Sequence, residues 1–430
     1  MMMNKSDYPS IGETLYSGEL PNGLRICVLP KPGFSTFYAV FGTNYGGAMR
    51  KFEVDGTVAE TPAGVAHFLE HKMFDMPSGE NALSVFSENG ASPNAFTSSS
   101  YTCYYFKCTD GFEENLRLLL QFVSTPYFTP ETVAKEQGII GQEILMGEDS
   151  PGSEGYYNLL SLLYKNHPIR DKIAGTVESI AQITDKTLYD CHKVFYAPSN
   201  MVLCVEGDVD PEEVFRIASE ELTKEKRSIP HADFGEPEED LPSSPKIDVM
   251  MPVSEPMFLV GCKNRMMSEK KGPEDLRERM ISSIALRLLA GQSSPFFSRL
   301  YSQGIITNSI DAECDYAAET STVLLGAEGP DPDRFLRELN SEVTNIAQNG
   351  FEPGFFERTL KAAIGGQLKG YEDFDETCVN MCLGFLDGYN CLDAYELLKN
   401  ITKEECEHWI TANLIPERMA MSVISPVRQE

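Results

Sequence analysis

The sequence predicts an α+β fold in which one unit of strands and helices occurs twice. The chain has 430 residues, which at about 150 residues per domain indicates two or three domains. Its hydrophobic fraction of 42% and charged fraction of 23% are typical of globular proteins and exclude collagen-like and wholly disordered chains. The expected strands and helices follow the same order in both halves of the chain, which indicates a duplication.

In the first half, residue type and periodicity distinguish strands from helices. Short runs of β-branched and aromatic residues predict strands, and apolar residues that recur every three or four positions predict helices. Thr129, Pro130 and Glu131 predict the start of a further helix, because proline is favoured at the first helical position. The expected elements are a strand at 24–29, a strand at 37–42, a helix at 65–74, a strand at 101–108, a helix at 112–123 and a helix from 129.

The second half repeats this order. Its Phe-Glu-Pro-Gly sequence at 351–354 stands 223 positions after the Phe-Thr-Pro-Glu sequence at 128–131, and each precedes a long helical pattern. A duplicated α+β unit explains this repetition better than chance does. The expected elements are a strand at 257–262, a helix at 276–289, a strand at 322–326, a helix at 333–347 and a helix from 352.

A segment dense in proline and acidic residues separates the two halves. It extends over residues 227–256 and shows little apolar periodicity, which is typical of a linker. We therefore predict an N-terminal domain at 1–226, a linker at 227–256 and a C-terminal domain at 257–430.

The chain is strongly acidic, with 36 Lys and Arg against 65 Asp and Glu and a net charge of −29. This charge repels phosphate backbones and anionic lipid, so it disfavours nucleic-acid and membrane partners. We expect no transmembrane helix, because no run approaches about 18 apolar residues, and no signal peptide is visible at the start. The eleven cysteines form no Cys-x-x-Cys pair, which favours reduced, buried thiols and hence a cytoplasmic protein.

The most informative sequence is His-x-x-Glu-His at residues 67–71. On a helix, His67 and His71 lie one turn apart, so both imidazoles can reach one ion at the zinc–nitrogen distance of about 2.0–2.1 Å. Glu70 projects to the same face and is better placed to hold a water molecule than to bind the ion. This order of residues is one of the zinc-peptidase motifs. Thr61 as the cap and Pro62 as the first helical residue would place the motif in the second and third turns.

A third protein ligand is needed, because so short a pattern also arises by chance and catalytic zinc takes three protein ligands with one open position. The other histidines are isolated, and cysteines would form a closed site, so a carboxylate remains. The helix that begins at 129 carries Glu136 and Glu143 two turns apart on one face. Glu131 lies in its first turn, where the helix dipole accounts for an acid. From spacing alone, Glu143 as ligand with Glu136 beside it and the reverse assignment both stay open.

Gly138 and Gly141 lie between these two glutamates. Two glycines inside a helix cost about 2 kcal/mol relative to alanine. We expect a close approach to the histidine helix to offset this cost, so that Gly141→Leu would reduce bound zinc. Tolerated surface glycines are the alternative.

Beyond the zinc motif, the chain carries a specific set of short sequences that together extend over most of its length. They are Leu-Pro-Asn-Gly-Leu at 20–24, Gly-Val-Ala-His-Phe-Leu-Glu-His-Lys-Met-Phe at 64–74, Asn-Ala-Phe-Thr at 94–97, the span 136–144, Gly-Thr at 175–176, Tyr-Ala-Pro-Ser-Asn-Met at 196–201 and Gly-Asp at 207–208. With this set the chain resembles the insulinase/pitrilysin peptidases, the M16 or inverted-zincin family. It is most similar to half-length bacterial members related to the mitochondrial processing peptidase.

The resemblance implies a zinc-dependent endopeptidase that acts on peptides or unfolded segments. It implies zinc (Zn2+) on His67, His71 and Glu143, with Glu70 as the general base on the zinc-bound water and Glu136 as an auxiliary active-site acid.

The resemblance also implies the architecture around this site. Asn94, Ala95 and Phe96 are implied to lie on a strand edge near the metal, where an extended peptide adds as a further strand. Each half is implied to be an α+β domain with a mixed, mostly antiparallel sheet backed by helices. Two chains are implied to close into a hollow dimeric shell.

The second half departs from the family pattern. Residues 285–289, which match the metal helix, offer no ligands, so we expect one zinc site per chain. Active members hold the substrate with an Arg and a Tyr around an Arg-Gly-Leu-x-Tyr turn, but here Arg299 and Tyr301 precede Gly304 out of register. We therefore expect a related chain to supply this clamp in a heterodimer. The alternative function is a catalytically quiet assembly or partner subunit.

Overall fold

The computed structural model describes residues 3–264 and 272–427, so the ends of the predicted domains at residues 1 and 430 lie outside the described ranges. The fold is α+β, as predicted, with sheets backed by helices. The chain forms two compact units, each assembled from separate segments. Unit 1 consists of Met1–Ile144, Asp171–Phe234 and Leu368–Leu392, and unit 2 consists of Leu145–Arg170, Gly235–Gln367 and Asp393–Glu430.

A seven-stranded sheet forms the centre of unit 1, in the order β1-β2-β3-β9-β4-β8-β7. Neighbouring strands are antiparallel except β3 and β9, which are parallel. The central strand β9 is buried along its whole length, whereas β7 lies at the edge. The strands are β1 (Met3–Tyr8), β2 (Glu13–Glu19), β3 (Arg25–Pro30), β4 (Phe37–Thr43), β7 (Ser92–Thr97), β8 (Thr102–Cys108) and β9 (Met201–Gly207).

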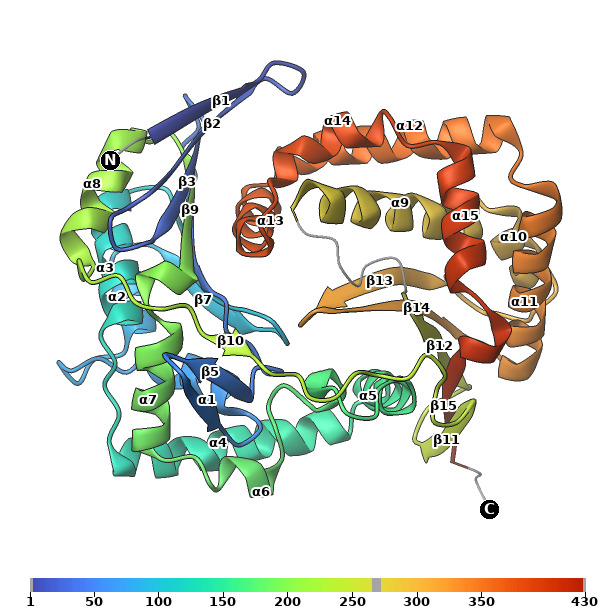
Figure 1. Ribbon diagram of the computed structural model, residues 1–430, viewed down its shortest axis with the longest axis horizontal. Helices are drawn as coiled ribbons and strands as arrows, with labels where there is room; N and C mark the ends of the chain where they lie inside the picture. Colours follow the sequence, from blue (N-terminus) through green and yellow to red (C-terminus); the bar gives the residue numbers. More distant parts are fainter. Residues whose placement is uncertain (1–2, 265–271, 428–430) are drawn as a thin grey trace. The chain divides into compact units, whose positions relative to one another are not determined.

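Helices cover both faces of this sheet. Figure 1 shows α3 and α8 on one side of it and α13 on the other. Phe68 and Leu69 of α1 and Leu119 of α3 are fully buried in the core, and α13 packs on β4 and β9. A small second sheet has the order β10-β5-β6, with β5 (Lys51–Val54), β6 (Thr57–Glu60) and β10 (His231–Ala232). The helices are α1 (Val65–Met73), α2 (Ala82–Glu88), α3 (Phe112–Ser124), α6 (Val177–Ile180), α7 (Asp185–Phe195), α8 (Pro211–Glu221) and α13 (Phe374–Asp387), and α4 (Pro130–Glu148) begins in this unit.

Unit 2 is centred on a five-stranded sheet in the order β11-β15-β12-β14-β13. Figure 1 shows α5 on one side of this sheet and α11 on the other. Trp409 and Phe335 are fully buried in its core. The strands are β11 (Lys246–Met251), β12 (Met257–Lys263), β13 (Asp311–Ala317), β14 (Thr320–Glu328) and β15 (Ala420–Pro426). The helices are α5 (Pro151–Leu163), α9 (Pro273–Ala290), α10 (Pro295–Ser302), α11 (Pro332–Asn349), α14 (Ala394–Leu398) and α15 (Lys403–Asn413), and α12 (Pro353–Gly370) begins in this unit.

The two sheets share one topology, as the repeated order of elements predicts. Counted along the chain from β3 and from β11, the strands of the shared core stand in the order first, fifth, second, fourth, third. In both sheets the first and fifth strands are parallel and the other neighbours are antiparallel. The duplication therefore extends from the order of elements to their pairing.

The compact units differ from the contiguous domains predicted at 1–226 and 257–430. The helix α5 belongs to the first half of the chain but packs on β12 and β15 of unit 2. The helix α13 belongs to the second half but packs on β4 and β9 of unit 1. The predicted linker at 227–256 contains the strands β10 and β11. Each half of the chain thus contributes one helix to the unit formed mainly by the other half. Hydrophobic periodicity shows that a helix has a buried face but does not show which sheet covers that face. The sequence alone therefore cannot reveal this exchange of helices.

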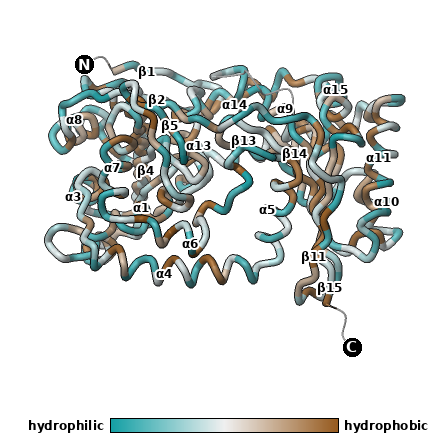
Figure 2. The backbone as a smooth tube through the Cα atoms, turned by 60° about the horizontal axis from the view of Figure 1, so that its bottom comes forward, coloured by the Kyte–Doolittle hydropathy of each residue, from teal (hydrophilic) through white to brown (hydrophobic). Residues whose placement is uncertain are grey.

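Hydrophilic and hydrophobic segments alternate along α4 in Figure 2. Its buried residues include Val133, Ile140 and Ile144, whereas Ile139 and Met146 are exposed. Within the described ranges, no helix combines the length and the apolar character that crossing a bilayer requires.

Candidate metal centre

The helix that carries the histidines begins at Val65, as the predicted range 65–74 has it, but its cap differs from the predicted one. Its cap is Gly64, whose φ of 95° lies in the left-handed region that favours glycine. A Cβ at this position would lie 2.6 Å from the carbonyl oxygen of Ala174, so two backbone segments are in close contact here. Thr61 donates its hydroxyl to a backbone carbonyl at 3.2 Å and lies before the helix. The prediction that Thr61 and Pro62 start the helix is therefore wrong, and His67 lies in the first turn.

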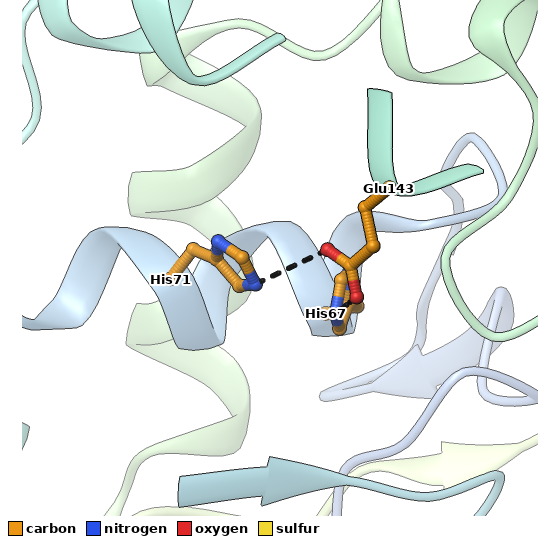
Figure 3. A group of neighbouring side chains, drawn as sticks. All are labelled: His67, His71 and Glu143. Atoms are coloured by element: carbon orange, nitrogen blue, oxygen red, sulfur yellow. Dashed lines mark ion pairs between the residues drawn. The ribbon is translucent and has the colours of Figure 1, made fainter. Parts of the chain in front are cut away.

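The side chains of His67, His71 and Glu143 converge on one point. One possible ligand atom from each lies within 4.8 Å of the other two. Nε2 of His67 is 3.5 Å from Oε1 of Glu143, and Nε2 of His71 is 3.6 Å from Oε2 of Glu143. Figure 3 shows Glu143 extending toward the two imidazoles on α1. Ligands at about 2.0–2.1 Å around a tetrahedral zinc stand roughly 3.3 Å apart, so these three side chains fit such an ion with little movement.

Glu136 and Glu143, which the spacing left interchangeable, have different surroundings. Glu143 faces Nε2 of both imidazoles, whereas Oε1 of Glu136 lies 3.1 Å from Nδ1 of His71, on the far side of that ring. A carboxylate on the second ring nitrogen fixes the tautomer and the orientation of a metal-binding histidine. The geometry thus favours Glu143 as the ligand and Glu136 as the residue that orients His71.

The charges in this cluster shift the pKa values of its members. The hydrogen bond from His67 and the charges of both histidines lower the pKa of Glu143 against the opposing effect of burial. Burial lowers the pKa of His71, but its hydrogen bond to Glu136 and the nearby carboxylates outweigh burial and raise it. Burial raises the pKa of Glu136, but His71 and Lys72 outweigh it and lower the pKa. The cluster therefore keeps both carboxylates anionic, as cation binding requires.

Lys72 also belongs to this cluster, although no sequence pattern predicted it. The side chain is buried, and its Nζ lies 3.9 Å from Oε2 of Glu136 and forms an ion pair with Asp75. A buried lysine is rare unless it is paired. Its position directly after His71 in the motif is the only signal that the sequence offers.

Glu70 lies outside the group of three. Its side chain is only 9% exposed, and its Oε2 accepts a hydrogen bond from Oγ1 of Thr97 at 2.7 Å. Thr97 ends the strand β7 and directly follows the three residues predicted to receive the substrate, but no sequence pattern predicted its contact with Glu70. Because side chains alternate along a strand, Thr97 shares its face with Ala95, which packs against the core that includes α1. The alternation of side chains along the strand could therefore have predicted that Thr97 faces α1.

The predicted substrate strand is part of β7. Among the residues that the structure describes, β7 pairs with β8 alone, so its other edge is free. Asn94 is exposed, and Ala95 and Phe96 are half-buried. The strand edge thus lies next to Glu70 through Thr97.

Gly138 and Gly141 do not mark a close approach of two helices. A Cβ at either position would meet no atom within 4 Å. The expected contact is therefore wrong, and the prediction that Gly141→Leu reduces bound zinc loses its basis. The helix α4 reaches the histidines through the long side chains of Glu136 and Glu143 instead of through its backbone.

The residues of the second half that depart from the family pattern have other partners or are buried in unit 2. Nη2 of Arg299 lies 2.7 Å from Oε2 of Glu342, and Tyr301 stacks on Phe297 with a centroid distance of 5.7 Å. Residues 285–289 lie in α9, and all of them except the arginine are buried in the core.

A fold of two duplicated α+β units with a His-x-x-Glu-His helix and a distant glutamate defines a class of zinc metallopeptidases. The family described as "Insulinase (Peptidase family M16)" matches residues 55–177, and the family described as "Peptidase M16 inactive domain" matches residues 182–363. The chain belongs to the M16 peptidase family.

Individual relatives match the chain over nearly its full length. It is 36% identical to the uncharacterized zinc protease YmfH of Bacillus subtilis, over 99% of this chain and 100% of that protein. An M16-like peptidase from Alicyclobacillus acidocaldarius has 32% identity and a TM-score of 0.91, over 98% of this chain and 100% of that one. A protease from Helicobacter pylori shares the fold with a TM-score of 0.84 at 17% identity, over 96% and 99% of the two chains.

Proposed function

We propose that the protein is a zinc-dependent endopeptidase that hydrolyses peptide bonds in peptides or unfolded segments. The observation that carries this proposal is the convergence of His67, His71 and Glu143 on one point, with Glu70 beside them and outside the ligand set. Membership of the M16 family and the names of the relatives as zinc proteases support it.

Each residue of the site has a distinct part in this proposal. His67, His71 and Glu143 hold the ion, and Glu136 orients His71. Bound zinc lowers the pKa of water toward about 7 and polarises the peptide carbonyl. Glu70 takes a proton from the attacking water and delivers it to the leaving amine.

The free edge of β7 provides the binding mode for an extended peptide. The backbone groups of Asn94, Ala95 and Phe96 would pair with the substrate as with a further strand, so that affinity depends little on the substrate sequence. An extended substrate strand requires a peptide or an unfolded segment, because a folded protein offers few unpaired strands.

We further propose that the active form is a two-chain clamshell in the cytoplasm, in which a related chain supplies an Arg/Tyr clamp. The pairing of Arg299 with Glu342 within unit 2 supports the need for a partner, because this arginine is already engaged. The eleven cysteines are free thiols, which supports a reducing compartment.

The test combines metal analysis with peptide hydrolysis. We expect about one zinc per chain by elemental analysis, and cleavage of a quenched fluorescent peptide that stops when a chelator is added and returns with zinc. The assay is run with the chain alone and mixed with a related M16 chain. Full activity of the chain alone as a homodimer would contradict the proposed clamp from a partner.

The alternative, a catalytically quiet assembly or partner subunit, gives a different result in the same test. A chain that binds zinc but cleaves no peptide, alone or mixed, would replace the endopeptidase with this alternative.

A further inference from the structure

The contact between Thr97 and Glu70 joins the strand edge to the helix of the zinc motif. Thr97 is the last residue of β7 and Glu70 lies in α1. The hydroxyl of Thr97 lies 2.7 Å from Oε2 of Glu70, within the usual range for a hydroxyl that donates to a carboxylate. Among the described residues, no other side chain or backbone group donates a hydrogen bond to the carboxylate of Glu70.

The hydroxyl of Thr97 has a second neighbour in the hydroxyl of Thr102. The two threonines face each other across β7 and β8, with their Oγ1 atoms 3.3 Å apart. Thr102 is fully buried and donates to the carbonyl oxygen of Tyr45 at 2.9 Å. The carbonyl and the carboxylate carry no proton to donate. Thr102 therefore donates its proton to Tyr45, and Thr97 donates its own to Glu70, whose oxygen at 2.7 Å is nearer than that of Thr102 at 3.3 Å.

This arrangement makes the two oxygens of Glu70 different. Oε2 is held by Thr97, whereas Oε1 has no hydrogen-bond partner among the described residues. A carboxylate with one fixed oxygen cannot rotate about its terminal bond without losing that hydrogen bond, so the second oxygen keeps a constant direction.

We propose that Thr97 is a positioning residue that holds the Glu70 carboxylate so that Oε1 is the oxygen that takes the proton from the attacking water. This inference rests on the proposed endopeptidase function. It assigns two parts to β7: its backbone edge receives the substrate strand, and its last side chain aligns the base. The substrate carbonyl and the base would then be placed by the same strand.

The test uses two replacements of Thr97 that differ only in the hydroxyl. Thr97→Val keeps the shape and suits a strand, and Thr97→Ser keeps the donor. Thr57→Val, an exposed strand threonine of β6, is the matched control. With zinc saturating, we expect Thr97→Val to lower kcat by about 10- to 100-fold with KM changed less than about threefold, since misplacing a catalytic group costs rate more than binding. Thr97→Ser is expected to restore kcat to within about threefold of the wild type.

A second measurement does not depend on activity. Zinc affinity, measured by chelator competition, is expected to stay within about threefold of the wild type in Thr97→Val, because among the described residues the Thr97 hydroxyl bonds to Glu70 and Thr102 and not to the proposed ligands. Urea unfolding of the metal-free proteins compares Thr97→Val, Glu70→Ala and the double variant. If the hydroxyl acts through Glu70, the double variant unfolds at the same midpoint as Glu70→Ala.

The outcomes separate this inference from the proposed function. A wild-type protein that binds zinc but cleaves nothing refutes the endopeptidase, and the unfolding comparison then still decides whether Thr97 acts through Glu70. An active wild type with an equally active Thr97→Val, a Thr97→Ser as impaired as Thr97→Val, or additive unfolding effects would each overturn the role of Thr97.

Discussion

The two ring nitrogens of His71 have different partners, and this difference organises the candidate metal centre. Nε2 faces Glu143 and Nδ1 faces Glu136. The first contact brings a carboxylate to the point where an ion would bind, and the second holds the ring in position. In the proposed function the residues are divided between holding the ion, orienting its ligands and moving a proton, and each of these proposed roles has its own test.

Replacing the proposed base should separate chemistry from metal binding. We expect Glu70→Gln to keep its zinc and to lose about 10²- to 10⁴-fold in rate, the usual effect of removing a general base. His67→Ala and Glu143→Ala should lose the metal, because each removes one of three ligands. Elemental analysis and peptide hydrolysis measured on the same preparations check both. A Glu70→Gln protein that hydrolyses peptides at the wild-type rate would rule out Glu70 as the base.

Replacing Glu136 should weaken zinc binding without removing a ligand. Glu136→Gln loses the charged acceptor for Nδ1 of His71, and such partners typically contribute about 10- to 100-fold in metal affinity. Chelator competition measures this loss. Glu131→Gln is the control, since this acid lies in the first turn of the same helix. Equal zinc affinities for the two variants would contradict the orienting part of Glu136.

At the scale of elements, the glycines of α4 show that a glycine inside a helix does not by itself indicate a close contact with another helix. Gly138 and Gly141 have no neighbours that a Cβ would meet, so nothing in the packing requires glycine at either position. We expect Gly138→Ala and Gly141→Ala each to raise the free energy of unfolding by about 0.5–1 kcal/mol, because alanine restricts the unfolded chain. Urea unfolding measures it, and a loss of stability or of zinc in either variant would restore the close contact first expected.

The segment Leu368–Leu392 is held to the sheet of unit 1 by a buried group of charges. Nζ of Lys31 lies 2.6 Å from Oε1 of Glu13, 3.3 Å from Oε1 of Glu206 and 3.2 Å from the carbonyl oxygen of Tyr371. Glu206 is fully buried on β9. Burial raises the pKa of Glu206 to about 8, against the opposing charge of Lys31.

This pKa predicts how stability depends on pH. In the unfolded chain the pKa of a glutamate is about 4.3. Between that pH and about 8, the folded protein therefore binds a proton at Glu206 that the unfolded chain has released. The contribution of Glu206 is therefore present at low pH and is lost as the pH rises through this window. Urea unfolding at several pH values should show a shallower decline for Glu206→Gln than for the wild type. Glu53→Gln, on the exposed side of β5, is the control. Parallel curves for all three proteins would contradict the prediction.

At the scale of the whole molecule, neither half of the chain contains a complete unit. Unit 1 requires Leu368–Leu392 from the second half, and unit 2 requires Leu145–Arg170 from the first. The helices α13 and α5 in these segments cover sheet faces of the unit to which they belong. Without them, apolar faces of β4, β9, β12 and β15 would be open to solvent, which promotes aggregation.

Separate expression of the two halves tests this exchange. Fragments 1–234 and 235–430 are expected to be insoluble or aggregated when each is made alone. Made together they are expected to form a 1:1 complex, because each fragment carries the segment that completes the unit of the other fragment. Size-exclusion chromatography with yield measurement shows the difference. Two stable, monomeric fragments would instead support the contiguous domains at 1–226 and 257–430.

The sequence by itself determined the local structure and the repeated plan. Residue type, periodicity and proline position depend on the backbone within a few residues, so α3, β12 and the start of α4 were predictable. The spacing of His67 and His71 likewise placed two imidazoles on one helix face, because helix geometry alone decides it.

Only the tertiary structure decided the contacts between segments that are distant in the chain. It showed that Glu143 and Glu136 contact different histidine nitrogens and that Thr97 bonds to Glu70. It also showed that α13 packs on the sheet of unit 1. The cap of α1 also depended on a distant segment, since the carbonyl oxygen of Ala174 leaves no room for a Cβ at Gly64. A side chain's face follows from the few residues around it, whereas its partner depends on how whole elements pack, and no local pattern carries that information.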